Sequence, residues 1–191
     1  MRRAEKEPLR RRLLAARSER SAPAVDAARA AVRAHVLDLA AAHGWRCVAA
    51  YVPLRTEPGS VELLAGLHRA GVRVLVPLIE DDRDLDWASW EPGIPIDAMH
   101  PASSADGLGR GAIEQADAVL VPALAVDPTT GVRLGRGGGS YDRALARASE
   151  GAEVIALLFD GELVPGLPAD EWDRPVAAVV DPAGLTRVGP H

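Results

Sequence analysis

The stretch DAVLVPALAVDPTTGVRLGRGGGSYDR (117–143) joins an apolar run to a loop rich in glycine and arginine. The run DAVLVPALAV (117–126) predicts one long β-strand, because a continuously apolar segment is typical of a strand covered on both faces. A helix is expected from about Tyr141 to Ala148. A strand, a loop and a helix in this order form the repeating unit of an α/β fold with a parallel sheet.

The rest of the chain continues this alternation of strands and helices. Two N-terminal helices are predicted, with a break near Ser21–Pro23 and a stop at Gly44. A third helix begins after Ser60 as N-cap and stops at Gly71. The remaining expected elements are a short helix at 112–116 and strands at 47–53, 72–79, about 85–90, 153–160 and, as the last one, 176–182. This order predicts an α/β protein, a three-layer α/β/α sandwich with a mostly parallel central sheet.

Length and composition fit one globular domain, residues 1–191. Of the 191 residues 48% are hydrophobic and only 4% aromatic, so Ala, Val and Leu must fill most of the core. Cys47 is the single cysteine, which excludes an internal disulfide and favours a reducing, cytoplasmic location. No apolar run reaches the roughly 20 residues that span a bilayer, and the basic N-terminus lacks the apolar segment of a signal peptide. We therefore expect a cytoplasmic protein without membrane contact.

Charge is distributed unevenly along the chain. Residues 1–20 carry eight basic and three acidic side chains, a net charge of +5, although the whole chain has a net charge of −5. A basic arm on an acidic body is compatible with nucleic-acid binding, but this arm has no interleaved aromatic residues and no nucleic-acid motif. It predicts an exposed helix face or a site for a small polyanion, and we expect no nucleic-acid partner.

The glycine loop itself has features of an anion site. Five glycines fall within the nine positions 131–139, although glycine is the costliest residue to order. Ligands of open α/β sheets bind beyond the carboxyl ends of the strands, and glycines let backbone N–H groups approach phosphate oxygens there. Arg133 and Arg136 supply positive charge, and the start of the next helix supplies a favourable dipole. The pattern favours a polyphosphate cradle, and the alternative is a flexible connection with scattered arginines.

Known phosphate-binding motifs match this loop only in part. The Gly-Lys-Ser/Thr triplet of a P-loop is absent from the sequence. GRGGGS (135–140) approaches the Rossmann fingerprint G-x-G-x-x-G, and Asp160 stands where a ribose-binding acid is expected. However, Ser140 replaces the third glycine, and about eight residues separate the predicted strand from Gly135. An NAD(P)-binding module is therefore an alternative that rests on this partial match.

Asp142 follows the loop directly and would repel a bare phosphate. A magnesium ion between them resolves this conflict, because Mg²⁺ binds one or two carboxylates together with phosphate oxygens. The segment DEWDRP (170–175) offers a second carboxylate. The alternative is that Asp142 only complements the dipole of a first helical turn.

Four motifs occur in order along the chain. Lys6 and Arg10 frame a Lys-x-x-Leu-Arg motif, and a tyrosine strand leads from Tyr51 to Glu57. The other motifs are the strand and loop VPALAVD (121–127) with GVRLGRGGGSYD (131–142), and the late segment EWDRPV (171–176). This set spans essentially the whole chain and resembles the 5-formyltetrahydrofolate cyclo-ligase family, also called methenyltetrahydrofolate synthetases.

The resemblance implies an ATP- and Mg²⁺-dependent enzyme with a three-layer fold. In that family the formyl oxygen of 5-formyltetrahydrofolate attacks the γ-phosphate of ATP. N10 then closes the ring and phosphate leaves, which gives 5,10-methenyltetrahydrofolate. The resemblance implies small-molecule substrates and, in solution, a monomer or weak homodimer.

The resemblance also implies roles for individual residues. It implies ATP contacts for Lys6, Arg10, Arg133, Leu134, Gly135, Arg136, Gly137, Gly138, Gly139, Ser140 and Tyr141. It implies folate contacts for Val52, Glu57, Arg136, Gly137, Gly138, Gly139 and Ser140. Asp142 and Asp173 are implied as magnesium ligands, and Arg133, Arg136 and Asp142 as catalytic residues.

The sequence departs from the family pattern at three places. Ser140 replaces an aromatic residue, Trp172 replaces a smaller polar residue, and Met99–Pro101 replaces an acid-proline pair. These changes fall mainly on the folate side. They leave open a second function, that of a nucleotide- or folate-binding relative without turnover, for which Ser140 is the suspect position.

Overall fold

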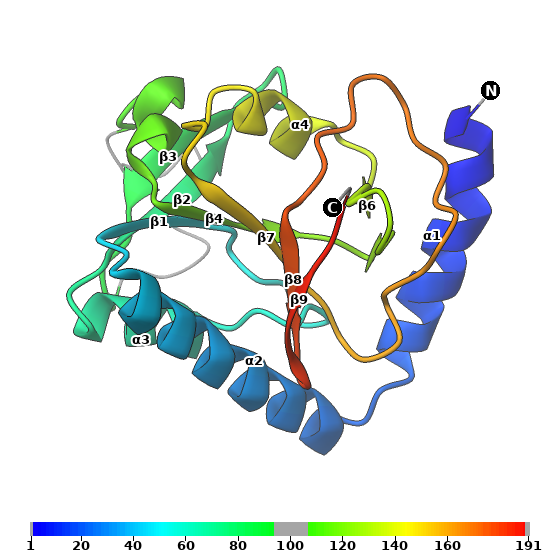
Figure 1. The fold of residues 1–191 in the computed structure, drawn as a ribbon, viewed down its shortest axis with the longest axis horizontal. Helices are drawn as coiled ribbons and strands as arrows, with labels where there is room; N and C mark the ends of the chain where they lie inside the picture. The colour runs from blue at the N-terminus through cyan, green and yellow to red at the C-terminus, as the bar shows by residue number, and fades with distance from the viewer. Residues whose placement is uncertain (1, 94–106, 190–191) are drawn as a thin grey trace.

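The computed structural model describes residues 2–93 and 107–189, and the expected departure at Met99–Pro101 lies outside them. A seven-stranded sheet forms the centre of the molecule (Figure 1). Its strands, in spatial order, are β3 (Leu85–Ser89), β2 (Arg73–Ile79), β1 (Cys47–Ala50), β4 (Ala118–Pro122), β7 (Glu153–Leu157), β8 (Ala178–Asp181) and β9 (Gly184–Arg187). The five inner strands are parallel, and only the edge strands β3 and β9 pair antiparallel. The predicted α/β class with a mostly parallel sheet is confirmed.

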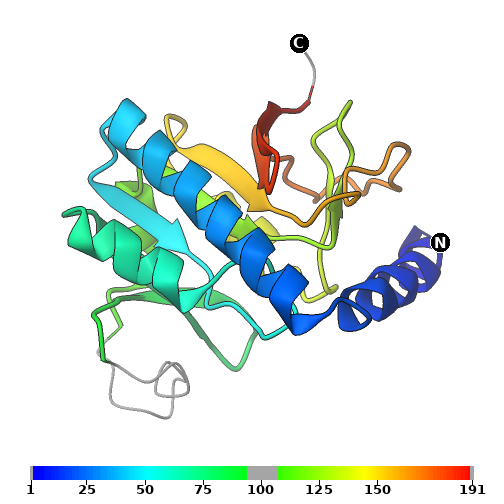
Figure 2. The same cartoon turned by 90° about the horizontal axis from the view of Figure 1, so that it is seen from below.

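Helices cover both faces of this sheet. On one face α2 (Ala22–His43) and α3 (Val61–Arg69) lie side by side, as Figure 2 shows. Leucines and valines of both helices pack there against side chains of β1, β2, β4 and β8. The other face is covered by two short elements, the 3₁₀ helix η2 (Arg110–Gln115) and α4 (Ser140–Leu145). The strands are continuously apolar because both of their faces are buried.

Helix boundaries follow the predicted capping residues. Ser21 and Ser60 cap α2 and α3, and each side-chain hydroxyl accepts a hydrogen bond from a backbone N–H three residues on. Gly44 ends α2 in the left-handed conformation, with φ of 65°. None of the helices in residues 2–93 and 107–189 is long and apolar enough to cross a membrane.

Helix α1 (Arg2–Ser18) lies apart from the central sheet and packs on a second, two-stranded sheet (Figure 1). This small sheet pairs β5 (Ala125–Val126) with β6 (Arg133–Leu134) in antiparallel orientation. Leu13 of α1 is buried against it, together with Leu124 and Leu167. The arrangement places the basic face of α1 beside the glycine loop, which follows β6.

The single long strand predicted at 117–126 is wrong. The chain leaves the central sheet after Pro122 and enters the small sheet at Ala125. At the crossing the carbonyl of Ala123 accepts a hydrogen bond from the Arg17 guanidinium instead of a strand neighbour. Both sheets are buried, so the sequence stays apolar across the break and hydrophobicity alone does not reveal it.

Other predicted bounds also differ, and the strands expected at 47–53 and 153–160 end at Ala50 and Leu157. The segment 176–182 contains β8, but β8 is not the last strand, since β9 follows it. A tight turn joins the two strands, and Asp181 accepts hydrogen bonds from two backbone N–H groups of this turn. Its side chains are mostly exposed, so β9 lacks an apolar signature. Helix α4 ends at Leu145 rather than Ala148, since the following hydrogen bonds span only three residues. Six residues give α4 a smaller dipole than the sequence suggested.

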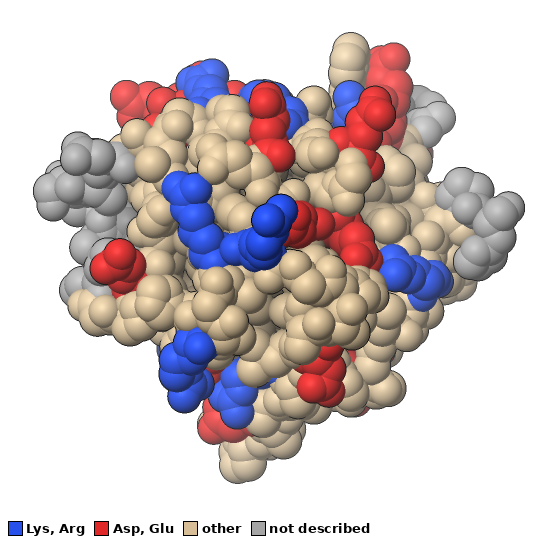
Figure 3. Space-filling model, turned by 60° about the vertical axis from the view of Figure 1, so that its left-hand side comes forward, with Lys and Arg blue, Asp and Glu red and all other residues tan. Residues whose placement is uncertain are grey.

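A cluster of charged side chains fixes α4 and η2 to the turn between β2 and β3. Asp84 in this turn is buried and accepts hydrogen bonds from Arg147, 2.7 Å, and Arg110, 3.1 Å. The hydrogen bond from Arg147 is the main reason that the pKa of Asp84 lies below its usual range. Such close mixing of charges is also visible on the surface in Figure 3, where Lys and Arg atoms abut Asp and Glu atoms.

Candidate functional site

A large cavity opens beyond the carboxyl ends of β1, β2 and β4. Its walls include Tyr51 and Val52 after β1 and Pro122 and Ala123 at the end of β4. The volume is about 1430 Å³. Pockets for one drug-sized ligand typically measure about 300–1,000 Å³, so this cavity has room for two substrates side by side.

The glycine loop forms one wall of this cavity, and Gly131 sets its starting direction. Gly131 has φ of 71°, and a Cβ built there would lie 2.5 Å from the carbonyl oxygen of Val176. The preceding Asp127 is buried and accepts backbone hydrogen bonds from the turn 129–130 and from residues 166–167. Only glycine fits this turn, which directs the chain from β5 back through β6 to the cavity.

Helix α1 contributes Lys6 and Arg10 to the same wall. The Lys6 ammonium lies 2.8 Å from Asp170 and 2.7 Å from Asp173, and its side chain is buried. Burial lowers the pKa of Lys6, but the hydrogen bonds and charges of the two aspartates outweigh it and raise the pKa above its usual range. Arg10 donates a 2.8 Å hydrogen bond to the carbonyl of Gly135. Its guanidinium lies over Gly137, where a Cβ would be 3.3 Å away.

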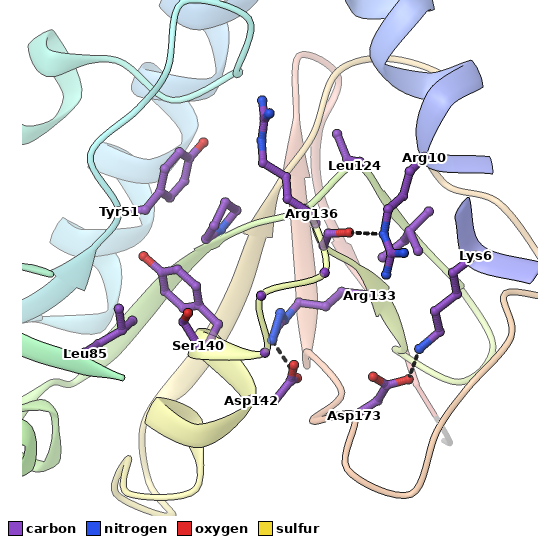
Figure 4. A pocket seen from close by; sticks show the side chains of 18 of the residues that line it. Lys6, Arg10, Tyr51, Leu85, Leu124, Arg133, Arg136, Ser140, Asp142 and Asp173 are labelled. Atoms are coloured by element: carbon purple, nitrogen blue, oxygen red, sulfur yellow. Dashed lines mark hydrogen bonds and ion pairs between the residues drawn. The ribbon is translucent and has the colours of Figure 1, made fainter. Parts of the chain in front are cut away.

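Arg133 and Asp142 form a second ion pair at this end of the cavity. Arg133 Nη2 donates to Asp142 Oδ1 over 2.7 Å, and the backbone N–H of Arg174 donates to the same oxygen. Arg133 is buried, and its Nε has no hydrogen-bond partner among the described residues. Figure 4 shows both ion pairs, Arg133 with Asp142 and Lys6 with Asp173, at one end of the cavity.

The carboxylates can hold a magnesium ion only with help from another ligand. In residues 2–93 and 107–189 no three His, Cys, Asp or Glu side chains are grouped closely enough to hold a metal ion. The predicted ligands Asp142 and Asp173 nevertheless lie on adjoining segments, because Arg174, next to Asp173, contacts Asp142. Two carboxylates match the share that proteins contribute to Mg²⁺ bound with a nucleotide, whose phosphates supply further oxygens.

The opposite end of the cavity combines apolar walls with one buried carboxylate. Glu57 is 5% exposed, and its Oε2 accepts a 2.9 Å hydrogen bond from the Leu54 backbone N–H. Its Oε1 lies 3.4 Å from Arg136 Nε, so the pair bridges the cavity from the glycine loop. Arg29 of α2 holds the Glu57 loop in place by donating to the carbonyls of Leu54, Arg55 and Glu57.

Two tyrosines lie at this apolar end. The hydroxyl of Tyr51 accepts a 3.0 Å hydrogen bond from the Gly59 backbone N–H. Burial and the charge of Glu57 raise the pKa of Tyr51, so its hydroxyl stays protonated. Burial likewise raises the pKa of Tyr141, whose hydroxyl has no hydrogen-bond partner among the described residues. Leu85 and Tyr51 mark this end in Figure 4, away from Lys6 and Asp173.

Every site residue implied by the family resemblance lines this one cavity. These residues are Lys6, Arg10, Val52, Glu57, Arg133, Leu134, Gly135, Arg136, Gly137, Gly138, Gly139, Ser140, Tyr141, Asp142 and Asp173. Asp160, the candidate ribose-binding acid, does not line it, and the loop follows β6 of the small sheet rather than a central strand. The Rossmann interpretation thus lacks its structural context.

Sequence reasoning missed several residues that shape the site. Arg29, which holds the Glu57 loop, lies in no recognisable motif. Asp170 lies in the segment 170–175, but nothing in that segment indicates that its carboxylate pairs with Lys6. Leu54, Ile79 and Leu85 complete the apolar wall. Their only sequence signal is position, since Ile79 ends β2, Leu85 begins β3 and Leu54 follows β1.

Comparison with known proteins gives a consistent result. The family model described as "5-formyltetrahydrofolate cyclo-ligase family" matches residues 2–182. The chain is 41% identical over 149 residues to the 5-formyltetrahydrofolate cyclo-ligase of Mycolicibacterium smegmatis, covering 72% of this chain and 74% of that protein. It is 30% identical over 143 residues to the 5-formyltetrahydrofolate cyclo-ligase of Escherichia coli, covering 71% of this chain and 78% of that one.

Solved structures share the fold. A 5,10-methenyltetrahydrofolate synthetase from Aquifex aeolicus aligns with a TM-score of 0.77 at 24% identity, covering 95% of this chain and 92% of that one. One from Mycoplasma pneumoniae aligns with a TM-score of 0.76 at 18% identity, covering 93% of this chain and 98% of that one. The ordered motifs, the family match and the relatives agree, and the chain belongs to the 5-formyltetrahydrofolate cyclo-ligase family, a family of ligases.

Proposed function

We propose that this enzyme converts 5-formyltetrahydrofolate and ATP to 5,10-methenyltetrahydrofolate, ADP and phosphate with the help of Mg²⁺. One observation carries the proposal: a single cavity has a glycine loop with cations and carboxylates at one end and an apolar wall with a buried carboxylate at the other. The first end suits a metal-bound triphosphate, and the second suits the flat, polar-edged pterin ring. The glycine loop lies between them, where the γ-phosphate and the formyl group would meet.

At the nucleotide end, the cationic side chains are the proposed phosphate ligands. Lys6, Arg10 and Arg133 are held by carboxylates or backbone carbonyls around the loop 133–141. The Nε of Arg133, buried without a partner among the described residues, is a donor for a phosphate oxygen. A triphosphate carries about four negative charges, so it competes for these cations and releases the carboxylates for a metal ion.

Asp142 and Asp173 are the proposed holders of Mg²⁺. When bound, the ion neutralises charge on the phosphate oxygens and makes the γ-phosphorus easier to attack. Oxygen ligands alone suit this hard cation. The two aspartates leave most coordination positions of the ion to phosphate and water. A third carboxylate ligand is then not needed, in agreement with the lack of a three-residue metal cluster among the described residues.

At the folate end, Glu57 is the proposed ligand of the pterin. Its carboxylate accepts hydrogen bonds and so matches the donor edge of a 2-amino-4-oxopterin. Val52 provides apolar contact beside it. Arg136, which now bridges to Glu57, has an exposed guanidinium and moves toward the phosphates when folate takes its place.

The chemistry follows from this alignment. The formyl oxygen attacks the γ-phosphorus and the bond from phosphorus to the ADP oxygen breaks, which leaves an imidate phosphate on the folate. N10 then attacks the formyl carbon, loses its proton, and the carbon–oxygen bond breaks to release phosphate. Phosphorylation is needed because an amide oxygen is otherwise a poor leaving group. Arg133 and Arg136 stabilise the charge that develops on the transferred group, and the cavity walls hold both substrates in reacting geometry.

The test mixes the protein with Mg-ATP and 5-formyltetrahydrofolate and follows methenyltetrahydrofolate absorbance. Asp142→Asn is expected to lower turnover at least about 100-fold and to weaken Mg-ADP binding, because one metal ligand loses its charge. The matched control is Asp160→Asn, which changes an exposed aspartate outside the cavity and should leave both unchanged. Unchanged turnover in Asp142→Asn would show that this residue is only a helix-end aspartate.

The same assay tests the alternative of a binding protein without turnover. Ser140, the first residue of α4, lines the cavity where the family usually has an aromatic ring. If Mg-ADP and the folate both bind but no product forms, the catalytic proposal fails and the binding function remains. Tight NADH binding without ADP binding would instead support the dinucleotide interpretation.

A further inference from the structure

Trp172 is an aromatic side chain that the proposed reaction does not use. The chain has four tryptophans, and three of them, Trp45, Trp87 and Trp90, are buried. Trp172 is 76% exposed, although exposing an indole ring to water is unfavourable. Phe159 and the two tyrosines are buried or half-buried, so among the phenylalanine, tyrosine and tryptophan side chains of the described residues only Trp172 is exposed. Such an exposed ring at a cavity is typical of a ligand contact.

The position of Trp172 in the cavity points to one end of it. Trp172 lines the cavity and precedes Asp173, whose carboxylate is 2.7 Å from the Lys6 ammonium. The segment is held from both sides, because Asp170 also pairs with Lys6 and its backbone N–H donates to Asp173. Figure 4 places Lys6 and Asp173 at the end opposite Tyr51 and Leu85. Trp172 therefore lies at the end that we assign to the nucleotide, and not on the folate side that the departures from the family pattern suggested.

We propose that Trp172 binds the nucleobase of ATP by stacking its indole ring on the purine. This inference rests on the proposed function and adds a residue for base recognition, since the contacts proposed for the nucleotide so far reach only phosphates. Lys6 and Arg10 fix the phosphates by charge, and a purine beyond them needs a flat apolar surface. Stacking tolerates many bases because every base has a π face, and alanine substitutions at such rings weaken binding roughly 5- to 150-fold.

The test separates base binding from phosphate binding. We compare Mg-ADP with Mg-tripolyphosphate in calorimetric titrations of Trp172→Ala, Trp172→Phe and the unchanged protein. Trp172→Ala should weaken Mg-ADP binding at least about fivefold and leave tripolyphosphate binding unchanged, since only the nucleotide has a base. Trp172→Phe keeps a ring and should recover most of the affinity.

A fluorescence readout requires no catalytic activity. Because the other tryptophans are buried, most quenching by acrylamide should come from Trp172, and Mg-ADP should protect it while tripolyphosphate should not. Equal loss of ADP and tripolyphosphate affinity in Trp172→Ala would overturn the inference, because it would indicate a disturbed Lys6–Asp173 contact. Protection of Trp172 from acrylamide by 5-formyltetrahydrofolate but not by Mg-ADP would also overturn the inference and assign Trp172 to the folate. If ADP protects Trp172 but no methenyltetrahydrofolate forms, the stacking stands and the proposed reaction fails.

Discussion

Replacing Arg17 is expected to have two effects, a lower stability of the protein and weaker nucleotide binding. Arg17 is 2% exposed and holds the C-terminal end of α1 to the turn after β7. Its guanidinium donates two hydrogen bonds to Glu162, both 2.7 Å, and one to the Ala123 carbonyl, 2.6 Å. The same helix carries Lys6 and Arg10, so its anchor also positions the proposed phosphate ligands.

The magnitude follows from the burial of the pair. Arg17→Met leaves the Glu162 carboxylate, 4% exposed, with one remaining donor among the described residues, the Phe159 backbone N–H. Breaking one side of a buried ion pair costs about 3–5 kcal/mol, a large share of the roughly 5–15 kcal/mol that stabilises a typical domain. Most of this cost is the unpaired charge rather than the lost bonds. Arg17→Met/Glu162→Gln should therefore recover at least about 1 kcal/mol relative to Arg17→Met.

Urea unfolding and Mg-ADP titration measure the two effects. Arg12→Met is the matched control, because Arg12 is exposed on the same helix and arginine and methionine have similar helix propensities. Hydrogen exchange should show the loss of protection concentrated in α1. A loss below about 1 kcal/mol in Arg17→Met, or a double variant less stable than Arg17→Met, would refute the argument from the buried charge.

Three further changes test other parts of the site. Arg29→Met should raise KM for the formyl-folate about tenfold with unchanged ADP affinity, because charge-assisted hydrogen bonds to the Glu57 loop are lost. Arg33→Met, one turn along α2, is the control, and the same KM in Arg29→Met as in Arg33→Met would refute this role of Arg29. Gly131→Ala should cost at least about 2 kcal/mol of stability in urea unfolding because of its positive φ and the Val176 oxygen. Gly161 has a similar φ but open space around it, so Gly161→Ala should lower the free energy of unfolding by less. An equal loss of stability in the two variants would contradict the clash with the Val176 oxygen. Burial raises the pKa of Asp127, but four backbone N–H groups outweigh it and lower the pKa below its usual value. Its stabilisation is present above about pH 4 and lost as pH falls through the folded pKa, so Asp127→Asn should be less stable at pH 7 and change less between pH 5 and pH 3 than the unchanged protein.

The local sequence pattern determined most of the helices and central strands, and the resemblance to the family indicated much of the lining of the cavity. The caps Ser21 and Ser60 and the stop at Gly44 were readable because a helix end depends on a few neighbouring residues. The parallel direction of the inner strands was predictable because these strands are continuously apolar, which is typical of a parallel sheet covered on both faces. Motif order then indicated which loops meet at the carboxyl edge.

The tertiary structure decided how the chain is divided between two sheets and which charges pair. The run 117–126 is equally apolar on both sides of its break, so only the packing of α1 and the small sheet shows where it leaves the central sheet. Lys6 pairs with Asp173 across 167 positions, and Arg17 pairs with Glu162 across 145. A short stretch of sequence contains no information about such pairs, because each pair forms only when all the helices and strands between the two partners have packed. The sequence therefore supplied the chemical groups, and the fold assigned each its partner.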